Sequence, residues 1–185
     1  GSADAAATLH GLNTLFDLAL GESELIKIAA TLGADVPVCL SPAPAWMCGI
    51  GHEVTRLAAL PAADIVLVNP HKAVSTPEVF KALAASFELT PSQFVPQAFA
   101  DLAALIGFVQ AQGNALSAPA QALVPDIADC LRALSQAGAD FAAMSGSGAT
   151  CFALAPIGHG AAIAARYQKA RPHDWVQAGR LLGVD

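Results

Sequence analysis

A Ser-Gly-Ser-Gly turn between two short apolar runs constrains this chain more than any other segment. Residues 139–155 read ADFAAMSGSGATCFALA, so strand-forming residues precede and follow the turn. Such a pattern predicts a β-hairpin. Its small residues also let a ligand approach the backbone closely. The segment fits a binding hairpin and an ordinary tight hairpin equally well, because both need glycine at positive φ.

Composition favours a soluble, folded protein. Of the 185 residues, 55% are hydrophobic and 13% are charged, which is ample for a core. Apolar runs are interrupted by Gly, Pro or charged residues, short of the roughly 20 that a membrane helix needs. The net charge is −6 and the nine Lys and Arg residues are scattered, which disfavours a nucleic-acid surface. We expect no nucleic acid and no membrane among the partners.

The cysteines and histidines lack the spacing of a metal site. Cys39, Cys48, Cys130 and Cys151 form no Cys-x-x-Cys pair, and the five histidines are dispersed. Free cysteines in apolar segments usually behave as small hydrophobic residues. We therefore predict no structural metal site in this chain and a reducing, cytoplasmic location.

Apolar periodicity and Gly or Pro punctuation predict a mixed α+β fold. Ser2 is a candidate cap for the first helix, and Gly21 and Gly33 are expected to end the first two helices. Residues 87–96 are the most loop-like. Helices are expected over residues 3–20, 22–32, 77–86, 99–112, 117–123, 127–136 and 159–170. Strands are expected over residues 36–40, 45–48, 53–57, 65–68 and 175–180, besides the hairpin.

Three ordered motifs resemble the GHMP small-molecule kinases. They are Gly1 to Thr8, which resembles the end of a glycine-rich phosphate loop, Gly33-Ala34-Asp35-Val36-Pro37, and Met144 to Thr150. The combination is most similar to members that phosphorylate 4-diphosphocytidyl-2-C-methyl-D-erythritol. The resemblance implies a two-lobed α+β fold. Residues 1–59 would be the remnant of a ribosomal protein S5 domain 2-like, ATP-binding lobe, and residues 60–185 a ferredoxin-like lobe.

The resemblance also implies phosphoryl transfer from ATP, with Mg²⁺, to the 2-hydroxyl of that acceptor. Asp35 would be the general base, while Gly1, Ser2 and Ala3 would lie at the nucleotide phosphates. On local sequence alone, Asp35 is more often a turn-forming residue and Ser2 a plain helix cap.

On the acceptor side, the resemblance implies contacts from Thr76, Phe80 and the turn residues Ser145, Gly146, Ser147 and Gly148. Thr76 would contact the acceptor and Phe80 would stack on its cytosine ring. The local alternative makes Thr76 a helix N-cap, Pro77 the first helical residue and Phe80 a core residue. The segment at residues 49–53 resembles a family hairpin, and we give it a structural role.

The chain opens where the family has the end of its phosphate loop, so we expect upstream residues, including the lysine that partners Asp35, to lie outside it. We accordingly expect negligible kinase activity and exposed apolar surface for the 185-residue chain. The rival hypotheses are a non-catalytic binding or interaction domain and another GHMP kinase, such as a homoserine, mevalonate or galactose kinase. The expected oligomeric state is a monomer or a weak homodimer.

Overall fold

The chain forms two compact units in a computed structural model, which describes residues 1–185 except 42, 49–52, 85–97 and 182–185. The described residues up to Ala59, together with Ala98, belong to the first unit, and residues 60–84 and 99–181 belong to the second. None of the helices within these described ranges is long and apolar enough to cross a membrane.

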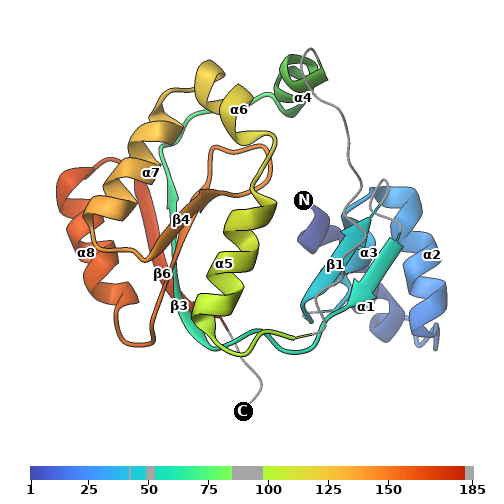
Figure 1. Ribbon diagram of the computed structural model, residues 1–185. Helices are drawn as coiled ribbons and strands as arrows, with labels where there is room; N and C mark the ends of the chain where they lie inside the picture. The colour runs from blue at the N-terminus through green and yellow to red at the C-terminus, as the bar shows by residue number, and fades with distance from the viewer. Residues whose placement is uncertain (42, 49–52, 85–97, 182–185) are drawn as a thin grey trace. The chain divides into compact units, whose positions relative to one another are not determined.

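The first unit combines short helices with a two-stranded hairpin. Its elements are α1 (Ser2–Leu15), α2 (Glu22–Leu32), α3 (Val36–Cys39), β1 (Ala45–Cys48) and β2 (Glu53–Arg56) (Figure 1). The strands pair antiparallel, with Ala45 opposite Arg56. Ala6, Ala29 and Val36, one from each helix, form a buried cluster. A small core therefore joins the three helices.

The strand expected over residues 36–40 is wrong, because this segment forms the helix α3. Pro37 lies in its first turn, where a helix tolerates the missing N–H. The Leu40 N–H donates to the Pro37 carbonyl at 3.3 Å. Val36 and Pro37 are both buried, so the apolar run that suggested a strand instead covers the helical core.

The first helix ends at Leu15, before the expected end at residue 20. Asp17 and Ala19 have φ of 47° and 51°, a left-handed conformation that a right-handed helix cannot continue. The Asn13 side-chain amide holds this bend by bonding the Leu20 carbonyl at 3.1 Å and the Leu20 N–H at 3.0 Å.

The second helix has the expected bounds, but its neighbouring glycine has a different role. Gly21 is the N-cap of α2, and Gly33 is its C-cap. Gly21 therefore begins the second helix and does not end the first. Leu25 and Ala29 are buried, whereas Leu32 on the expected apolar face is 56% exposed.

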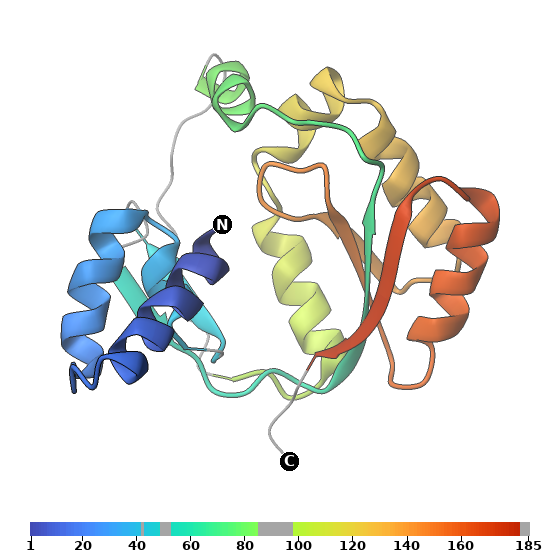
Figure 2. The same cartoon turned by 180° about the vertical axis from the view of Figure 1, so that it is seen from behind.

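The second unit is a four-stranded antiparallel sheet with helices on both faces. The strand order is β4-β5-β3-β6, so β3 and β5 are central (Figures 1 and 2). Its strands are β3 (Ala63–Asn69), β4 (Phe141–Met144), β5 (Cys151–Ala155) and β6 (Trp175–Leu181). Its helices are α4 (Thr76–Ala84), α5 (Leu102–Gln112), α6 (Ser117–Leu123), α7 (Asp126–Gln136) and α8 (Gly160–Ala170).

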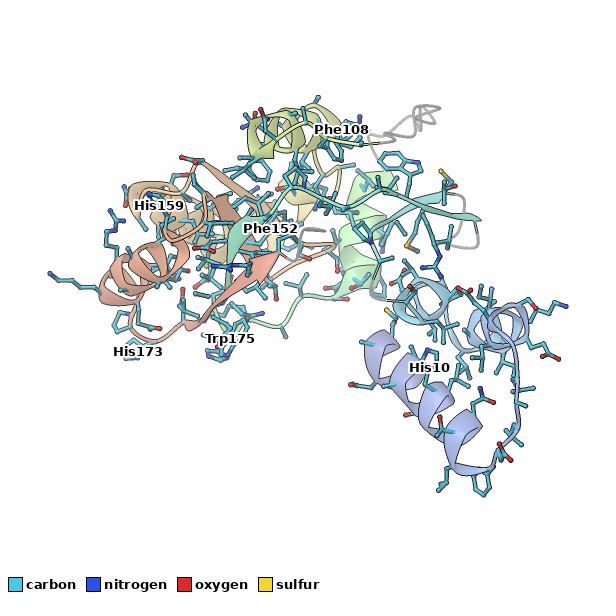
Figure 3. The ribbon with its side chains drawn as sticks, turned by 90° about the horizontal axis from the view of Figure 1, so that it is seen from below. His10, Phe108, Phe152, His159, His173 and Trp175 are labelled. Atoms are coloured by element: carbon cyan, nitrogen blue, oxygen red, sulfur yellow. The ribbon has the colours of Figure 1, made fainter. Side chains whose placement is uncertain are left out.

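Alternation along the strands gives this sheet two apolar faces. On β3, Val66 and Val68 face α7 and α8, while Ile65 faces α5. On the α5 face, the rings of Phe141 and Phe152 lie 5.9 Å apart; Phe152 is labelled in Figure 3. The buried residues of the larger core are Val66, Val68, Val79, Ala120, Ile127, Cys130, Ala133, Leu134, Ala137, Met144, Ala149, Cys151, Ala153, Ala155, Ile163 and Tyr167.

Most expected elements of the second unit are present within about three residues of their expected ends, and the mixed α+β fold is confirmed. The helix over residues 117–123 has the expected bounds, and residues 139–155 form the expected hairpin. The loop expected at residues 87–96 lies outside the described residues, as do residues 49–52 of the segment that resembled a family hairpin.

A buried carboxylate joins the start of α8 to the central strand. Asp64 on β3 is 9% exposed, and its Oδ2 accepts hydrogen bonds from the Gly158 and Gly160 N–H groups, both at 2.8 Å. Gly160 leaves room for this contact, since a Cβ there would lie 2.9 Å from the Asp64 Cβ. The Gly160 bond above all lowers the pKa of Asp64, while burial opposes that effect.

Replacing Asp64 with alanine is expected to lower the free energy of unfolding by about 2–3 kcal/mol at pH 7, because the buried Gly160 N–H and the part-buried Gly158 N–H lose a charged acceptor. The folded-state pKa is below the unfolded one, so this stabilisation is present above about pH 4 and is lost as the pH falls through the folded-state pKa. Urea unfolding of the wild type and Asp64→Ala from pH 7 to pH 3 checks this. The expectation would be contradicted if the difference in unfolding free energy between the two proteins did not narrow as the pH falls. Asp140→Ala, at an exposed aspartate, is the control.

Candidate functional site

The Ser-Gly-Ser-Gly segment forms the turn that joins β4 to β5. The Ser145 N–H donates to the Thr150 carbonyl at 2.9 Å, and the Gly148 N–H donates to the Ser145 carbonyl at 3.0 Å. Gly146 and Gly148 have φ of 55° and 90°, in the region that glycine adopts at least cost. These two glycines therefore have a backbone role whether or not a ligand is bound.

Side-chain hydrogen bonds tie this turn to α4 and to β3. The Thr76 Oγ1 and Ser147 Oγ lie 2.7 Å apart, in a hydrogen bond that either group can donate. The Asn69 Nδ2 donates to the Thr150 Oγ1 at 2.9 Å. The structure thus brings together Thr76 and Ser147, two residues predicted to contact an acceptor although they lie 71 positions apart.

The Thr76 hydroxyl is available for this contact because Ser75 caps α4. The Ser75 Oγ accepts from the Glu78 N–H at 3.4 Å, and the Ser75 carbonyl accepts from the Val79 N–H at 3.0 Å. These are the bonds of an N-cap residue. The alternative that makes Thr76 the N-cap is therefore wrong by one position.

Phe80 lies on the surface of α4, four residues after Thr76 and so on the same side of the helix. Its side chain is 53% exposed, whereas Val79 is fully buried in the core of the second unit. The alternative that makes Phe80 a core residue is wrong. Thr76, Ser147 and Phe80 instead present two hydroxyls and an exposed ring.

The turn also offers backbone donors. Within the part of the chain that the structure describes, the N–H groups of Gly146 and Ser147 have no acceptor. Consecutive backbone N–H groups around a left-handed residue form a concave donor site that suits anions. The neighbourhood of the turn therefore fits a polar ligand that carries negative charge.

A pocket of about 900 Å³ borders the start of the turn. Its lining comes from α5, α6, α7, β4, β5 and the segments before α6 and β4, and includes Ser145 and Gly146. Neither Thr76 nor Phe80 lines it. The pocket is thus distinct from the hydroxyl pair on α4 and the turn.

In the first unit, Asp35 immediately precedes α3, and its side chain is exposed. The carboxylate caps no helix N–H and has no hydrogen-bond partner among the described residues. The alternative prediction, in which the Asp35 side chain bonds its own backbone in a turn, is therefore wrong. Val36, the next residue, packs against Ala6 of α1, which joins the Asp35 loop to that helix.

α1 begins at Ser2, with Gly1 in the N-cap position, and no side chain bonds its first N–H groups. The prediction that Ser2 caps the helix is wrong. The N–H groups of a first helical turn carry partial positive charge. Those of Ser2 and Ala3 are thus donors of the kind that bind phosphate groups.

The described residues contain no cluster of three or more His, Cys, Asp or Glu side chains that could hold a metal ion. His159 and His173 illustrate the dispersion. They flank opposite ends of α8 and lie apart (Figure 3).

Two asparagines at the turn were missed by sequence reasoning. Asn69 ends β3, and Asn114 lies between α5 and α6, where its Nδ2 donates to the Met144 and Gly146 carbonyls at 3.1 and 2.9 Å. The available signals were an Asn-Pro pair after a strand and a Gly-Asn pair after a helix, which by themselves predict only turns.

Two family models match the chain. One, described as the GHMP kinases N terminal domain, matches residues 1–42, and one described as GHMP kinases C terminal matches residues 93–173.

Curated relatives are also similar over nearly the whole chain. A protein named 4-diphosphocytidyl-2-C-methyl-D-erythritol kinase from Ruegeria pomeroyi is 50% identical over 185 residues, which cover 98% of this chain and 65% of that protein. One of the same name from Paracoccus denitrificans is 48% identical, covering 98% of this chain and 63% of that protein. The chain therefore spans slightly less than two thirds of these relatives.

Solved structures show the same fold. A crystal structure of 4-(cytidine 5'-diphospho)-2C-methyl-D-erythritol kinase matches with a TM-score of 0.74 and 30% identity, over 99% of this chain and 65% of that one. Leishmania major mevalonate kinase with R-mevalonate matches with a TM-score of 0.64 and 20% identity, over 98% of this chain and 65% of that one. The second likeness concerns the fold alone.

The two glycines of the turn provide a matched pair of variants. A Cβ at Gly148 would lie 2.9 Å from the Met144 Sδ and 3.1 Å from the Ile127 Cδ1, whereas one at Gly146 meets nothing within 4 Å. Gly146→Ala is expected to cost about 1 kcal/mol from positive φ alone. Gly148→Ala is expected to cost about 2–4 kcal/mol, because overpacking adds to that strain. Equal losses in urea unfolding would contradict this reading of the turn.

Proposed function

Because this chain belongs to the GHMP kinase family, we propose that its protein transfers the γ-phosphoryl group of ATP to the 2-hydroxyl of 4-diphosphocytidyl-2-C-methyl-D-erythritol. The bond between the γ-phosphorus and the β–γ bridging oxygen breaks, and a bond from that phosphorus to the acceptor oxygen forms. ADP leaves, and Asp35 takes the hydroxyl proton. We assign residues 1–59 to the ATP-binding domain and residues 60–185 to the C-terminal domain, in a monomeric or weakly dimeric protein of the bacterial cytoplasm.

The hydrogen bond between Thr76 and Ser147 is the observation that supports the acceptor assignment most. The two hydroxyls lie at the turn whose Gly146 and Ser147 N–H groups have no acceptor among the described residues. Phe80 is exposed on the same side of α4 as Thr76. Hydroxyl and N–H donors suit the oxygens of a diphosphate, and an exposed aromatic ring suits stacking on a flat base. A diphosphocytidyl group carries both features.

The environment of Asp35 suits a proton acceptor. Its carboxylate is exposed and has no hydrogen-bond partner among the described residues, so it is free to accept a proton from an acceptor hydroxyl. Phosphoryl transfer depends mostly on positioning and charge stabilisation. Asp35 therefore has to orient the hydroxyl as well as remove its proton.

The start of α1 suits the ATP phosphates. The first N–H groups of this helix are uncapped, and Gly1, Ser2 and Ala3 would hold phosphate oxygens there. Mg²⁺ takes oxygen ligands and is usually held by few protein groups together with substrate phosphates. The Ser2 hydroxyl fits that role, and a bound Mg²⁺ would neutralise phosphate charge.

Asp35→Asn is expected to lower kcat at least about a hundredfold, because the amide cannot accept the hydroxyl proton. The Kd for ATP should change less than about threefold. The measurement is ADP release by the natural gene product that contains this chain, with 4-diphosphocytidyl-2-C-methyl-D-erythritol as acceptor.

The control for this variant is Asp17→Asn, the same substitution at a left-handed surface position that asparagine tolerates. Unchanged turnover in Asp35→Asn would sink the general-base assignment. Phosphorylation of mevalonate or homoserine in place of the diphosphocytidyl acceptor would replace the proposed substrate.

Phe80→Ala is expected to raise the KM for the diphosphocytidyl acceptor about tenfold, since stacking on a base contributes roughly 1–3 kcal/mol. Its exposed position means that stability should change by less than about 0.5 kcal/mol. Steady-state kinetics and urea unfolding of the same samples test both. Ile157→Ala, at another exposed apolar residue of the second unit, should change neither, and an unaltered KM in Phe80→Ala would remove the stacking role.

A further inference from the structure

The donor groups of the turn depend on the direction of one peptide plane. The Gly146 carbonyl and the Ser147 N–H belong to the same peptide group, which is trans. In a trans peptide the C=O and N–H point to opposite sides. Whatever holds the Gly146 carbonyl therefore also decides where the Ser147 N–H points.

Asn114 holds that carbonyl. Its Nδ2 donates to the Gly146 carbonyl at 2.9 Å and to the Met144 carbonyl at 3.1 Å. Its Oδ1 accepts from the Leu116 N–H at 3.0 Å, which fixes the direction of the amide. All the polar atoms of this side chain are thus engaged, and both donor hydrogens go to the turn.

Asn114 bonds the carbonyls of two peptide groups, and the N–H groups of these two peptides differ in their hydrogen bonding. The N–H that follows the Met144 carbonyl, on Ser145, is bonded to the Thr150 carbonyl inside the turn. The N–H that follows the Gly146 carbonyl, on Ser147, has no acceptor among the described residues. The first bond therefore completes the hairpin, while the second orients a free donor.

Gly146 makes this orientation dependent on Asn114. Gly146 has no side chain, and a Cβ at this position would meet nothing within 4 Å, so side-chain packing does not set its backbone angles. Glycine also permits the alternative backbone angles that a reversed peptide needs. A reversed peptide would turn the Gly146 carbonyl to the side where Ser147 now offers its N–H.

We propose that Asn114 is a positioning residue, which fixes the Gly146–Ser147 peptide so that the Ser147 N–H is presented to an anionic group of the ligand. Asn114 itself does not touch that group. The identity of the anion as the acceptor diphosphate rests on the proposed function. The orientation of the Gly146–Ser147 peptide by Asn114 is independent of the proposed function.

Asn114→Asp separates the two functions of the side chain. It keeps an oxygen for the Leu116 N–H, but replaces the donor group with a carboxylate oxygen that faces two carbonyls. Asn114→Ala removes both functions. Asn13→Ala is the matched control, because Asn13 also bonds backbone groups through its amide, in the first unit.

The experiment records the Gly146 carbonyl ¹³C and Ser147 amide ¹⁵N resonances of the 185-residue chain, then titrates it with pyrophosphate and with cytidine 5'-diphosphate. We expect Asn114→Asp and Asn114→Ala to shift both resonances and to weaken the binding of both probes about tenfold, as loss of a hydrogen bond to an anion does. Asn13→Ala should do neither.

Unshifted resonances in folded Asn114→Asp would overturn the proposal, as would unchanged affinities in the Asn114 variants when the wild type binds the probes. The Asn114 variants could shift both resonances while the wild type binds neither probe. That outcome would support the orientation of the peptide by Asn114 and count against the proposed acceptor. If Asn114→Ala does not fold, Asn114→Asp decides the matter, because it keeps the bond to Leu116.

Discussion

The central strand β3 is the element on which the second unit depends. It pairs with β5 on one side and β6 on the other, and its alternating side chains contribute to the cores on both faces of the sheet. Its two ends carry the polar contacts that place the remaining parts. Asp64 near its start anchors α8, and Asn69 at its end bonds Thr150 in the turn. One strand thus fixes both the packing of the helices and one side of the candidate site.

How well the sequence predicted each element follows from how local its determinants are. The hairpin and α6 depend on apolar spacing and on glycine at positive φ, so local reasoning placed them well. The segment at residues 36–40 has the composition of a strand, but burial against α1 and α2 makes it a helix. The early end of α1 depends on the Asn13 amide meeting Leu20, which periodicity does not reveal.

The same distinction applies to the candidate site. Thr76 and Ser147 were named by resemblance to a family, yet their contact depends on α4 following the end of the central strand and on Ser75 taking the capping position. Asn69 and Asn114 were not named, because a lone asparagine beside Pro or Gly carries only a turn signal. Their partners lie 81 residues away for Asn69, and 30 and 32 residues away for Asn114. Residue types could therefore be predicted from the sequence, whereas their hydrogen-bond partners could not.

A site built from backbone donors needs its peptide planes fixed, since the donors cannot be adjusted by side-chain rotation. Gly148 achieves part of this by close packing against Met144 and Ile127. A Cβ at Gly146 would meet nothing within 4 Å. The hydrogen bond from Asn114 therefore constrains the peptide at Gly146, whereas packing constrains the one at Gly148. Two glycines of one turn are thus constrained by different forces. A packed glycine resists reorientation sterically, whereas at Gly146 the direction of the donor depends on a hydrogen bond from outside the turn.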